Sequence, residues 1–352
     1  MRKNRSAPAG EVRRFTIESR ALAGNLLGDP TTRALHVYVP RGYDESRRLP
    51  LLVDLVGFTG SGMTHTNWRP FGENVPERLD RLIAEGAMGP VVAAFPDCFS
   101  RLGGNQYINS AAMGRYEDYL IDEVVPFVES RLAAGGPGRR ACFGKSSGGY
   151  GAIVHGMRRP DVWSAVACHS GDMGFELCYF FDVPMALNEL AKHDRSIEKF
   201  MAHFEQSKKP TDKELETLNL LAMAASYDPD PASFLGIRLP VDLETAEVIP
   251  ERWANWLKHD PVRIVEAQAD NLRRLKGIYI DCGNVDQYHL HFGARRLHRA
   301  LDRLGIAHRF EEFPDDHSNV DYRMDASLPF LERALTGATQ AQPEVATSEP
   351  RA

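Results

Sequence analysis

The chain has 352 residues, of which 43% are hydrophobic and 26% are charged, and its mean hydropathy is −0.35. This composition is typical of a globular protein with a full core, and it excludes disordered, collagen-like and membrane-spanning proteins. The 42 Lys and Arg residues against 48 Asp and Glu residues leave a formal net charge of −6, which argues against nucleic acid as a partner. No membrane partner is expected either, because no apolar stretch approaches the ~18 residues of a spanning helix.

Cysteine usage and the first residues bear on the compartment. The five cysteines are an odd number, none stands in a CxxC spacing, and we expect reduced, mostly buried thiols rather than disulfides. The basic and polar start is not followed by an apolar run of signal-peptide length. We therefore expect a cytoplasmic protein. Residues 1–13 are expected to form a disordered N-terminus. The cysteines are Cys98, Cys142, Cys168, Cys178 and Cys282.

Extended and helical patterns alternate along most of the chain. Residues 14–23 and 33–40 alternate between polar and β-branched or aromatic residues, which predicts an antiparallel hairpin. Short apolar runs then predict strands buried on both faces, and amphipathic stretches between them predict helices. This alternation is typical of a mostly parallel α/β sheet flanked by helices. The strands are expected at 51–56, 91–95, 140–143, 163–168, 277–281 and 308–313, and the helices at 75–84, 116–132, 150–158, 262–275, 294–304 and 326–334.

The alternation stops between residues 172 and 260. This segment has a charged helical part at 196–226, a proline-rich part at 229–250, and then Trp253 and Trp256, which are more often core residues than pocket walls. It is too long for a loop, so we interpret it as a helical cap inserted into one domain over 14–336. Residues 337–352 have few large apolar residues and are expected to form a disordered tail.

A serine flanked by glycines marks the first candidate for chemistry. Ser146 lies in the sequence GKSSGG, between the strand predicted at 140–143 and the helix predicted at 150–158. Such a strand-to-helix turn is a nucleophile elbow, which needs small neighbours and exposes the serine hydroxyl. The same letters suggest a phosphate-binding P-loop, but that motif needs a glycine at position 139, where the chain has Arg139. We therefore favour a nucleophile over a nucleotide site.

A nucleophilic serine needs a histidine base and a carboxylate that orients it. In an α/β-hydrolase both follow the serine along the chain, at the ends of later strands. Asp286 follows the strand predicted at 277–281, and His317 follows the strand predicted at 308–313. We prefer Asp286 to Asp281 as the acid because it lies in the loop with room to reach the histidine. Asp315 and Asp316 are interpreted as solvated turn residues.

Backbone N–H groups must stabilise the oxyanion that forms when the serine attacks. One donor is expected from Ser147, the residue after the nucleophile, and the other from Phe58 in the glycine-rich turn 55–62. A glycine-rich turn after a strand is also a common structural feature, so the second donor has a purely structural alternative.

Further polar and aromatic residues at strand ends are candidates for substrate binding. His169, together with Ser170 and Asp172, ends the strand predicted at 163–168, and satisfied structural polar groups are an equal alternative there. The candidate substrate-binding residues are Asn105, Tyr107, Ser110, His169 and Trp68.

His289 and His291, near Asp286, form an HxH pair that could bind a metal. No third ligand stands at a suitable spacing, so we expect no metal and no cofactor.

The motifs together resemble a known family. The segments GKSSGGYGA (144–152), LVGFTGSG (55–62), DCGNVDQYHLH (281–291) and EFPDDHS (312–318), with residues 106–129, are similar to the esterase D superfamily of α/β-hydrolases. That group includes S-formylglutathione hydrolases, enterochelin esterases, feruloyl and acetyl-xylan esterases and mycolyltransferases. By resemblance, Ser146 matches the nucleophile, Asp286 the acid, His317 the base, and Phe58 and Ser147 the oxyanion donors. The segment 172–260 and Lys145, which stands where S-formylglutathione hydrolases have histidine, depart from that pattern.

The expected function is a serine carboxylic-ester hydrolase that acts on a small-molecule ester through an acyl-enzyme. An acyltransferase or a thioesterase would use the same residues, and a hydrolase-like binding protein without turnover is the third possibility. Association into a homodimer is left open.

Overall fold

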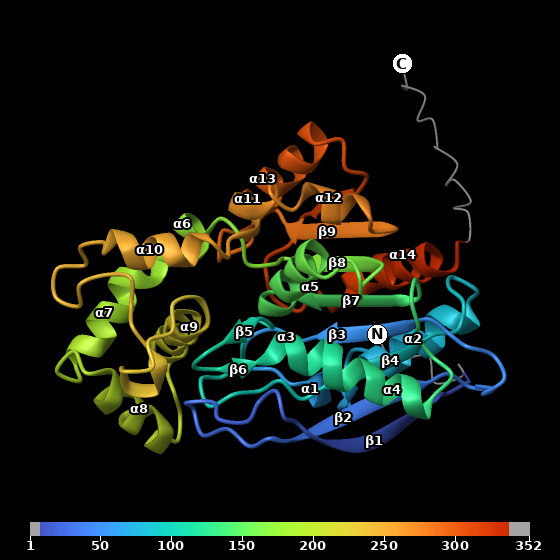
Figure 1. The fold of residues 1–352 in the computed structure, drawn as a ribbon, viewed down its shortest axis with the longest axis horizontal. Helices are drawn as coiled ribbons and strands as arrows, with labels where there is room; N and C mark the ends of the chain where they lie inside the picture. The colour runs from blue at the N-terminus through green and yellow to red at the C-terminus, as the bar shows by residue number, and fades with distance from the viewer. Residues whose placement is uncertain (1–7, 338–352) are drawn as a thin grey trace.

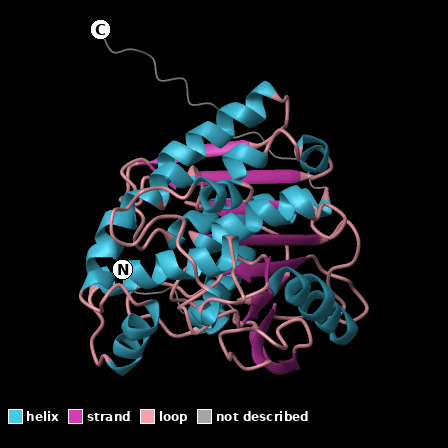
Figure 2. Cartoon of the chain, turned by 60° about the vertical axis from the view of Figure 1, so that its left-hand side comes forward, coloured by secondary structure: helices cyan, strands magenta, loops and turns pink. Residues whose placement is uncertain are grey.

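The computed structural model describes residues 8–337, which build one eight-stranded sheet with helices on both faces (Figures 1 and 2). The strand order is β1-β2-β4-β3-β7-β8-β9-β10. β1 pairs with β2 and β2 with β4 in antiparallel fashion, and the remaining neighbours are parallel. The strands are β1 (Glu11–Glu18), β2 (Thr32–Val39), β3 (Leu51–Leu55), β4 (Val92–Pro96), β7 (Arg140–Lys145), β8 (Ala165–His169), β9 (Gly277–Gly283) and β10 (Arg309–Phe313).

Alternation of side chains along the central strands produces two cores. In β3, Leu51, Val53 and Leu55 point into the larger core, while Leu52 points into the smaller one. The smaller core is covered by α2 (Val75–Ala84) and α14 (Met324–Thr336). The larger core is covered by α3 (Tyr116–Asp118), η1 (Tyr119–Val124), α4 (Val125–Arg131), α5 (Ser147–Arg158) and α13 (Leu290–Arg303).

The segment predicted as an insertion is mainly helical. Figure 1 shows α7 to α10 gathered at one end of the molecule, beside the short strands β5 (Asn109–Ser110) and β6 (Gly114–Arg115). Asp260 accepts hydrogen bonds from the backbone of Gly174 and Phe175, both at 3.0 Å, and so ties the two ends of the insertion together. We call residues 172–260 the cap. Its helices are α6 (Phe175–Cys178), η2 (Phe180–Asp182), α7 (Val183–Ala191), α8 (Ile197–Gln206), α9 (Asp212–Tyr227), η3 (Phe234–Gly236) and α10 (Pro250–Leu257).

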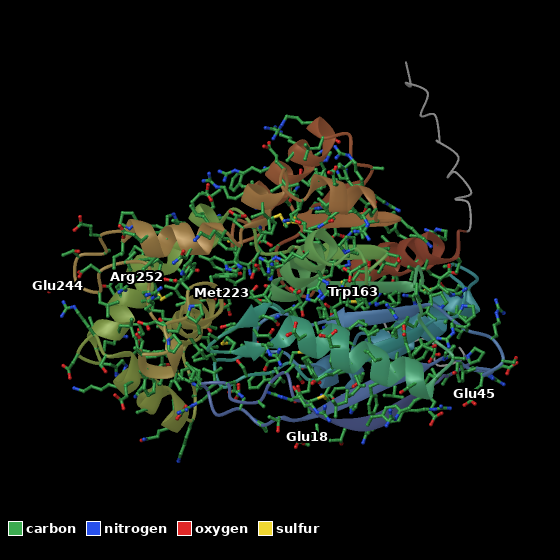
Figure 3. All side chains as sticks on the ribbon, in the orientation of Figure 1. Glu18, Glu45, Trp163, Met223, Glu244 and Arg252 are labelled. Atoms are coloured by element: carbon green, nitrogen blue, oxygen red, sulfur yellow. The ribbon has the colours of Figure 1, made fainter. Side chains whose placement is uncertain are left out.

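Aromatic side chains pack against one another inside the cap. Trp256 is fully buried against Tyr179 and Tyr227, which makes it a core residue of the cap. In Figure 3, Trp163 lies in the middle of the sheet layers, whereas Glu244 and Arg252 lie on the outer side of the cap.

Three sequence predictions about local structure need correction. Residues 11–13 are not disordered, because β1 begins at Glu11 and pairs with β2 as far as Val39. The helix expected at 262–275 is divided into α11 (Pro261–Ile264), which contacts both α5 and α13, and α12 (Ala269–Arg273), which contacts α5. The helix expected at 116–132 contains a π-helical segment, η1. Residues 1–7 and 338–352 of the predicted termini lie outside the described residues.

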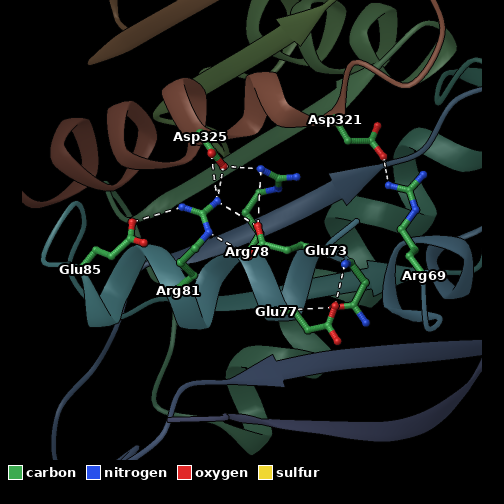
Figure 4. A network of polar contacts seen from close by, with 9 residues as sticks. Arg69, Glu73, Glu77, Arg78, Arg81, Glu85, Asp321 and Asp325 are labelled. Carbon is green, nitrogen blue, oxygen red and sulfur yellow. Dashed lines mark hydrogen bonds and ion pairs between the residues drawn. The ribbon is translucent and has the colours of Figure 1, made fainter. Parts of the chain in front are cut away.

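Ion pairs fix the chain that follows β10 (Figure 4). Arg81 of α2 contacts Asp325 at 2.8 Å and Glu73 at 2.8 Å, and Arg78 also contacts Asp325. Arg69 pairs with Asp321 in the short helix η4 (Asp321–Arg323). This network anchors the start of α14, just after the loop that contains His317.

Among residues 8–337, no helix has both the length and the apolar composition needed to cross a membrane.

Candidate active site

Ser146 occupies a strained turn between β7 and α5. Its φ of 58° and ψ of −125° lie outside the regions that side chains other than glycine favour, and backbone strain of this kind is concentrated at functional sites. The turn is possible because Gly144 and Gly148 have no side chains: a Cβ on Gly148 would lie 1.7 Å from the carbonyl oxygen of Leu55, and one on Gly144 would lie 2.1 Å from it. The expected nucleophile elbow is thus present as a local geometry.

Asp286 and His317 meet in the loops after β9 and β10. Nδ1 of His317 lies 2.8 Å from Oδ2 of Asp286, and both side chains are buried. The other carboxylate oxygen accepts a hydrogen bond from the backbone of Tyr288 at 2.9 Å, and Gln287 accepts one from the backbone of His317 at 2.9 Å. These contacts hold the imidazole with Nδ1 toward the carboxylate, which leaves Nε2 as the ring atom available for proton transfer.

The alternative carboxylates have other partners. Asp281 contacts Nδ1 of His169 at 2.7 Å and Arg323 at 2.9 Å, so both oxygens of its carboxylate already have partners other than His317. Asp315 accepts from the backbone of Asp316 and from the hydroxyl of Tyr322, as expected of a turn residue. Of these carboxylates, only Asp286 contacts His317.

The two expected oxyanion donors face the same cavity as Ser146. Within residues 8–337, no acceptor takes a hydrogen bond from the backbone N–H of Phe58 or Ser147. Gly57 allows its loop to approach the elbow, because a Cβ there would lie 3.2 Å from the carbonyl oxygen of Lys145 and 3.4 Å from the Cβ of Ser146. Both N–H groups therefore remain available for an oxyanion.

The cavity at Ser146 has a volume of about 450 Å³, which suits a small molecule. His317, Tyr288 and Lys145 line its sheet side, and α9 of the cap supplies Asp212, Leu215, Glu216 and Asn219. Lys145 donates from Nζ to the carbonyl oxygen of His317 at 2.9 Å, and burial lowers the pKa of its ammonium group.

Two contacts link the cap to the histidine. The ring of Tyr288 packs edge-on against the ring of His317, with 5.0 Å between the centroids. The hydroxyl of Tyr288 donates to Glu216 at 3.1 Å, and burial raises the pKa of that carboxyl group. Thr211 caps the first turn of α9 and so fixes the end of the helix that carries Asp212 and Glu216.

The five residues predicted to bind substrate do not line this cavity. Asn105 donates to the carbonyl of Cys98, Tyr107 to that of Val56 and Ser110 to that of Ala225. His169 lies between Asp281 and Ser327, and Trp68 is 70% exposed on the surface. The polar groups of the first four are therefore used to hold loops and strands in place.

The residues that sequence reasoning missed come mostly from the cap. Asp212, Glu216 and Asn219 lie along one side of the polar first half of α9, and their spacing is equally typical of a solvated face. For Tyr288, the one sequence signal is its position two residues after the predicted acid, Asp286.

One cluster of side chains outside the cavity could hold a metal ion. His298, Asp302 and His308 offer ligand atoms that all lie within 4.8 Å of one another. His289 and His291 do not belong to a group of this kind among the described residues. The ring of His289 packs instead against Phe181 and Phe292.

Comparisons with solved structures show the same fold in esterases. A ferulic acid esterase is 20% identical, with a TM-score of 0.60 over 93% of this chain and 99% of its own. The S-formylglutathione hydrolase FrmB from Staphylococcus aureus is 17% identical, with a TM-score of 0.55 over 94% of this chain and 99% of its own. An S-formylglutathione hydrolase from Agrobacterium tumefaciens is 16% identical, with a TM-score of 0.56 over 93% of this chain and 96% of its own. They confirm the expected α/β-hydrolase fold. The family model described as "putative esterase" matches residues 30–327, most of the chain. The chain therefore belongs to this esterase family, as the motifs predicted.

Proposed function

We propose that the protein is a serine carboxylic-ester hydrolase in which Ser146 is the nucleophile, His317 the base and Asp286 the residue that orients it. The observation that carries the proposal is the convergence of three separate strand ends. The strained serine after β7, the histidine after β10 and the two unengaged N–H groups of Phe58 and Ser147 all border one cavity.

The chemistry follows from this arrangement. The hydroxyl of Ser146 gives its proton to Nε2 of His317 as Oγ bonds to the ester carbonyl carbon. The negative charge that develops on the carbonyl oxygen is stabilised by the N–H groups of Phe58 and Ser147. His317 then protonates the departing alcohol, and the bond between carbonyl carbon and alcohol oxygen breaks. A water molecule activated by His317 releases the acid and restores Ser146.

The substrate is proposed to be a small-molecule ester, processed without a cofactor in the reducing cytoplasm. The five cysteines are unpaired and buried, which fits such a compartment. Acyl transfer and thioester hydrolysis use the same residues, and product analysis with added alcohols or thiols distinguishes them from ester hydrolysis.

Substitution of the nucleophile tests the proposal directly. Ser146→Ala should abolish hydrolysis of a short p-nitrophenyl ester and labelling by a fluorophosphonate probe, with an unchanged melting temperature. Ser130→Ala is the matched control, because Ser130 is exposed and its side chain hydrogen-bonds only to Phe127 and Arg131 of its own helix, α4. Turnover by Ser146→Ala at the rate of the unmodified protein would refute the proposal.

A further inference from the structure

A buried carboxylate lies beside the nucleophile without a role in the chemistry described so far. Asp172 follows β8, is 6% exposed and lines the cavity. Its Oδ1 lies 3.5 Å from Oγ of Ser146. A negative charge so close to the nucleophile opposes the anionic transition state, so its presence calls for a compensating group.

The two oxygens of Asp172 have different surroundings. Oδ2 accepts from the hydroxyl of Tyr179 at 2.8 Å, from Ser147 Oγ at 3.3 Å and from Gln106 at 3.4 Å. Oδ1 has a single donor among the described residues, the hydroxyl of Ser146 at 3.5 Å. Despite the donors at Oδ2, burial raises the pKa of the Asp172 carboxyl group above its ordinary value.

The reaction removes the one donor that Oδ1 has. When Ser146 attacks, its proton passes to His317, and in the acyl-enzyme Oγ is an ester oxygen with no proton. No other described residue donates to Oδ1, and a buried charged oxygen without a partner is costly. The acyl group itself is then the nearest source of a hydrogen-bond donor.

The distance between Oδ1 and Oγ suits a donor close to the carbonyl group of the acyl chain. A substituent on the carbon next to the carbonyl lies roughly 3 Å from Oγ by ordinary bond lengths and angles. Oδ1 of Asp172, a residue that lines the cavity, is 3.5 Å from Oγ. A donor there can reach Oδ1 at ordinary hydrogen-bond length. The wall across the cavity adds Asp212 and Glu216, so carboxylates outnumber the one lysine, Lys145, and favour a positive charge.

From these contacts we infer that the preferred substrates are esters of acids with an ammonium group on the carbon next to the carbonyl, which Asp172 recognises. The inference rests on the proposed function. The ammonium group donates to Oδ1 after Ser146 has lost its proton, and its charge offsets that of Asp172 in the transition state.

The test uses three p-nitrophenyl esters of the same shape, those of alanine, lactic acid and isobutyric acid. They place an ammonium, a hydroxyl or a methyl group at the same position. Each kcat/KM is divided by the rate constant of the same ester with hydroxide, so that intrinsic reactivity cancels, at a pH where the amine is protonated. We expect the alanine ester to exceed the isobutyrate ester by at least about tenfold, as a charge-assisted hydrogen bond provides, with lactate between them.

Asp172→Asn removes the charge and keeps the shape, and we expect it to bring the corrected alanine-to-isobutyrate ratio to within about threefold. Asp270→Asn, at a side chain that is 99% exposed, is the control and should keep the full ratio. A corrected ratio near one in the unmodified protein, or a ratio that Asp172→Asn leaves unchanged, would overturn the inference while ester hydrolysis stands. Failure of all three esters together with failure of fluorophosphonate labelling would instead refute the proposed function.

Discussion

Gly148→Ala should disable the site through a single added methyl group. The Cβ would lie 1.7 Å from the carbonyl oxygen of Leu55 and 2.5 Å from its carbonyl carbon, and both atoms are backbone. Since an ordinary contact begins at 3.4 Å, the start of α5 and the end of β3 must separate by about 1.7 Å. The two oxyanion donors lie on opposite sides of this contact, Ser147 on α5 and Phe58 after β3.

A displacement of about 1 Å in a catalytic group can cost roughly 100-fold in rate, so we expect kcat/KM of Gly148→Ala to fall at least about 100-fold. Overpacking should also cost about 1–3 kcal/mol of unfolding free energy, which urea denaturation measures. Gly57→Ala, with a contact of 3.2 Å, should have a smaller effect, and Gly72→Ala, with nothing within 4 Å, should have none. A folded Gly148→Ala protein with the activity of Gly72→Ala would refute the reasoning.

Three further changes test other parts of the site and the core. Asp286→Asn should lower kcat by roughly 10³–10⁴-fold at an unchanged melting temperature, because an amide no longer holds Nδ1 of His317 in the required tautomer; full activity would assign the acid elsewhere. Lys145→Met removes the 2.9 Å hydrogen bond to the His317 carbonyl and should lower kcat about fivefold with little change in KM, whereas an effect on KM alone would contradict a positioning role. Burial lowers the pKa of His155 from 6.5 to about 4, so its contribution to stability is complete above pH 6.5 and is lost as the pH falls toward 4. Between pH 7 and 5 this costs about 2 kcal/mol, and urea unfolding of His155→Gln should show a pH dependence weaker by that amount.

The centre of the sheet could be predicted from the sequence because its strands are buried on both faces. Runs such as 51–56 and 277–281 contain few polar residues, and the structure places β3 and β9 there. The order of the strands depends on crossovers between distant segments, which a local pattern does not specify. The division of 262–275 into two helices likewise depends on tertiary contacts, which join α11 to both α5 and α13 and α12 to α5.

The candidate triad could be predicted for a related reason, since parallel strands bring their carboxyl ends to one edge of the sheet. The same argument failed for Asn105 and Tyr107, which also follow a strand. The ring of Tyr107 fills the space beneath α5, where a Cβ on Gly151 would lie 2.7 Å from it. Position after a strand does not distinguish a loop that packs under α5 from a loop that lines the cavity. What separates them is the packing of distant segments.

One chain of hydrogen bonds joins the cap to Ser146, so a displacement in the cap is transmitted to the proposed nucleophile. Asp172 begins the cap, and its Oδ2 accepts from Tyr179, whose hydroxyl lies 3.1 Å from that of Tyr227 at the end of α9. Trp256 packs on both tyrosines. A shift of α9 therefore moves the cavity wall that carries Glu216 and also changes the donors that stabilise the carboxylate beside Ser146. The segment that interrupts the regular alternation of strands and helices thus contributes charged groups as well as a wall to the cavity beside the proposed nucleophile.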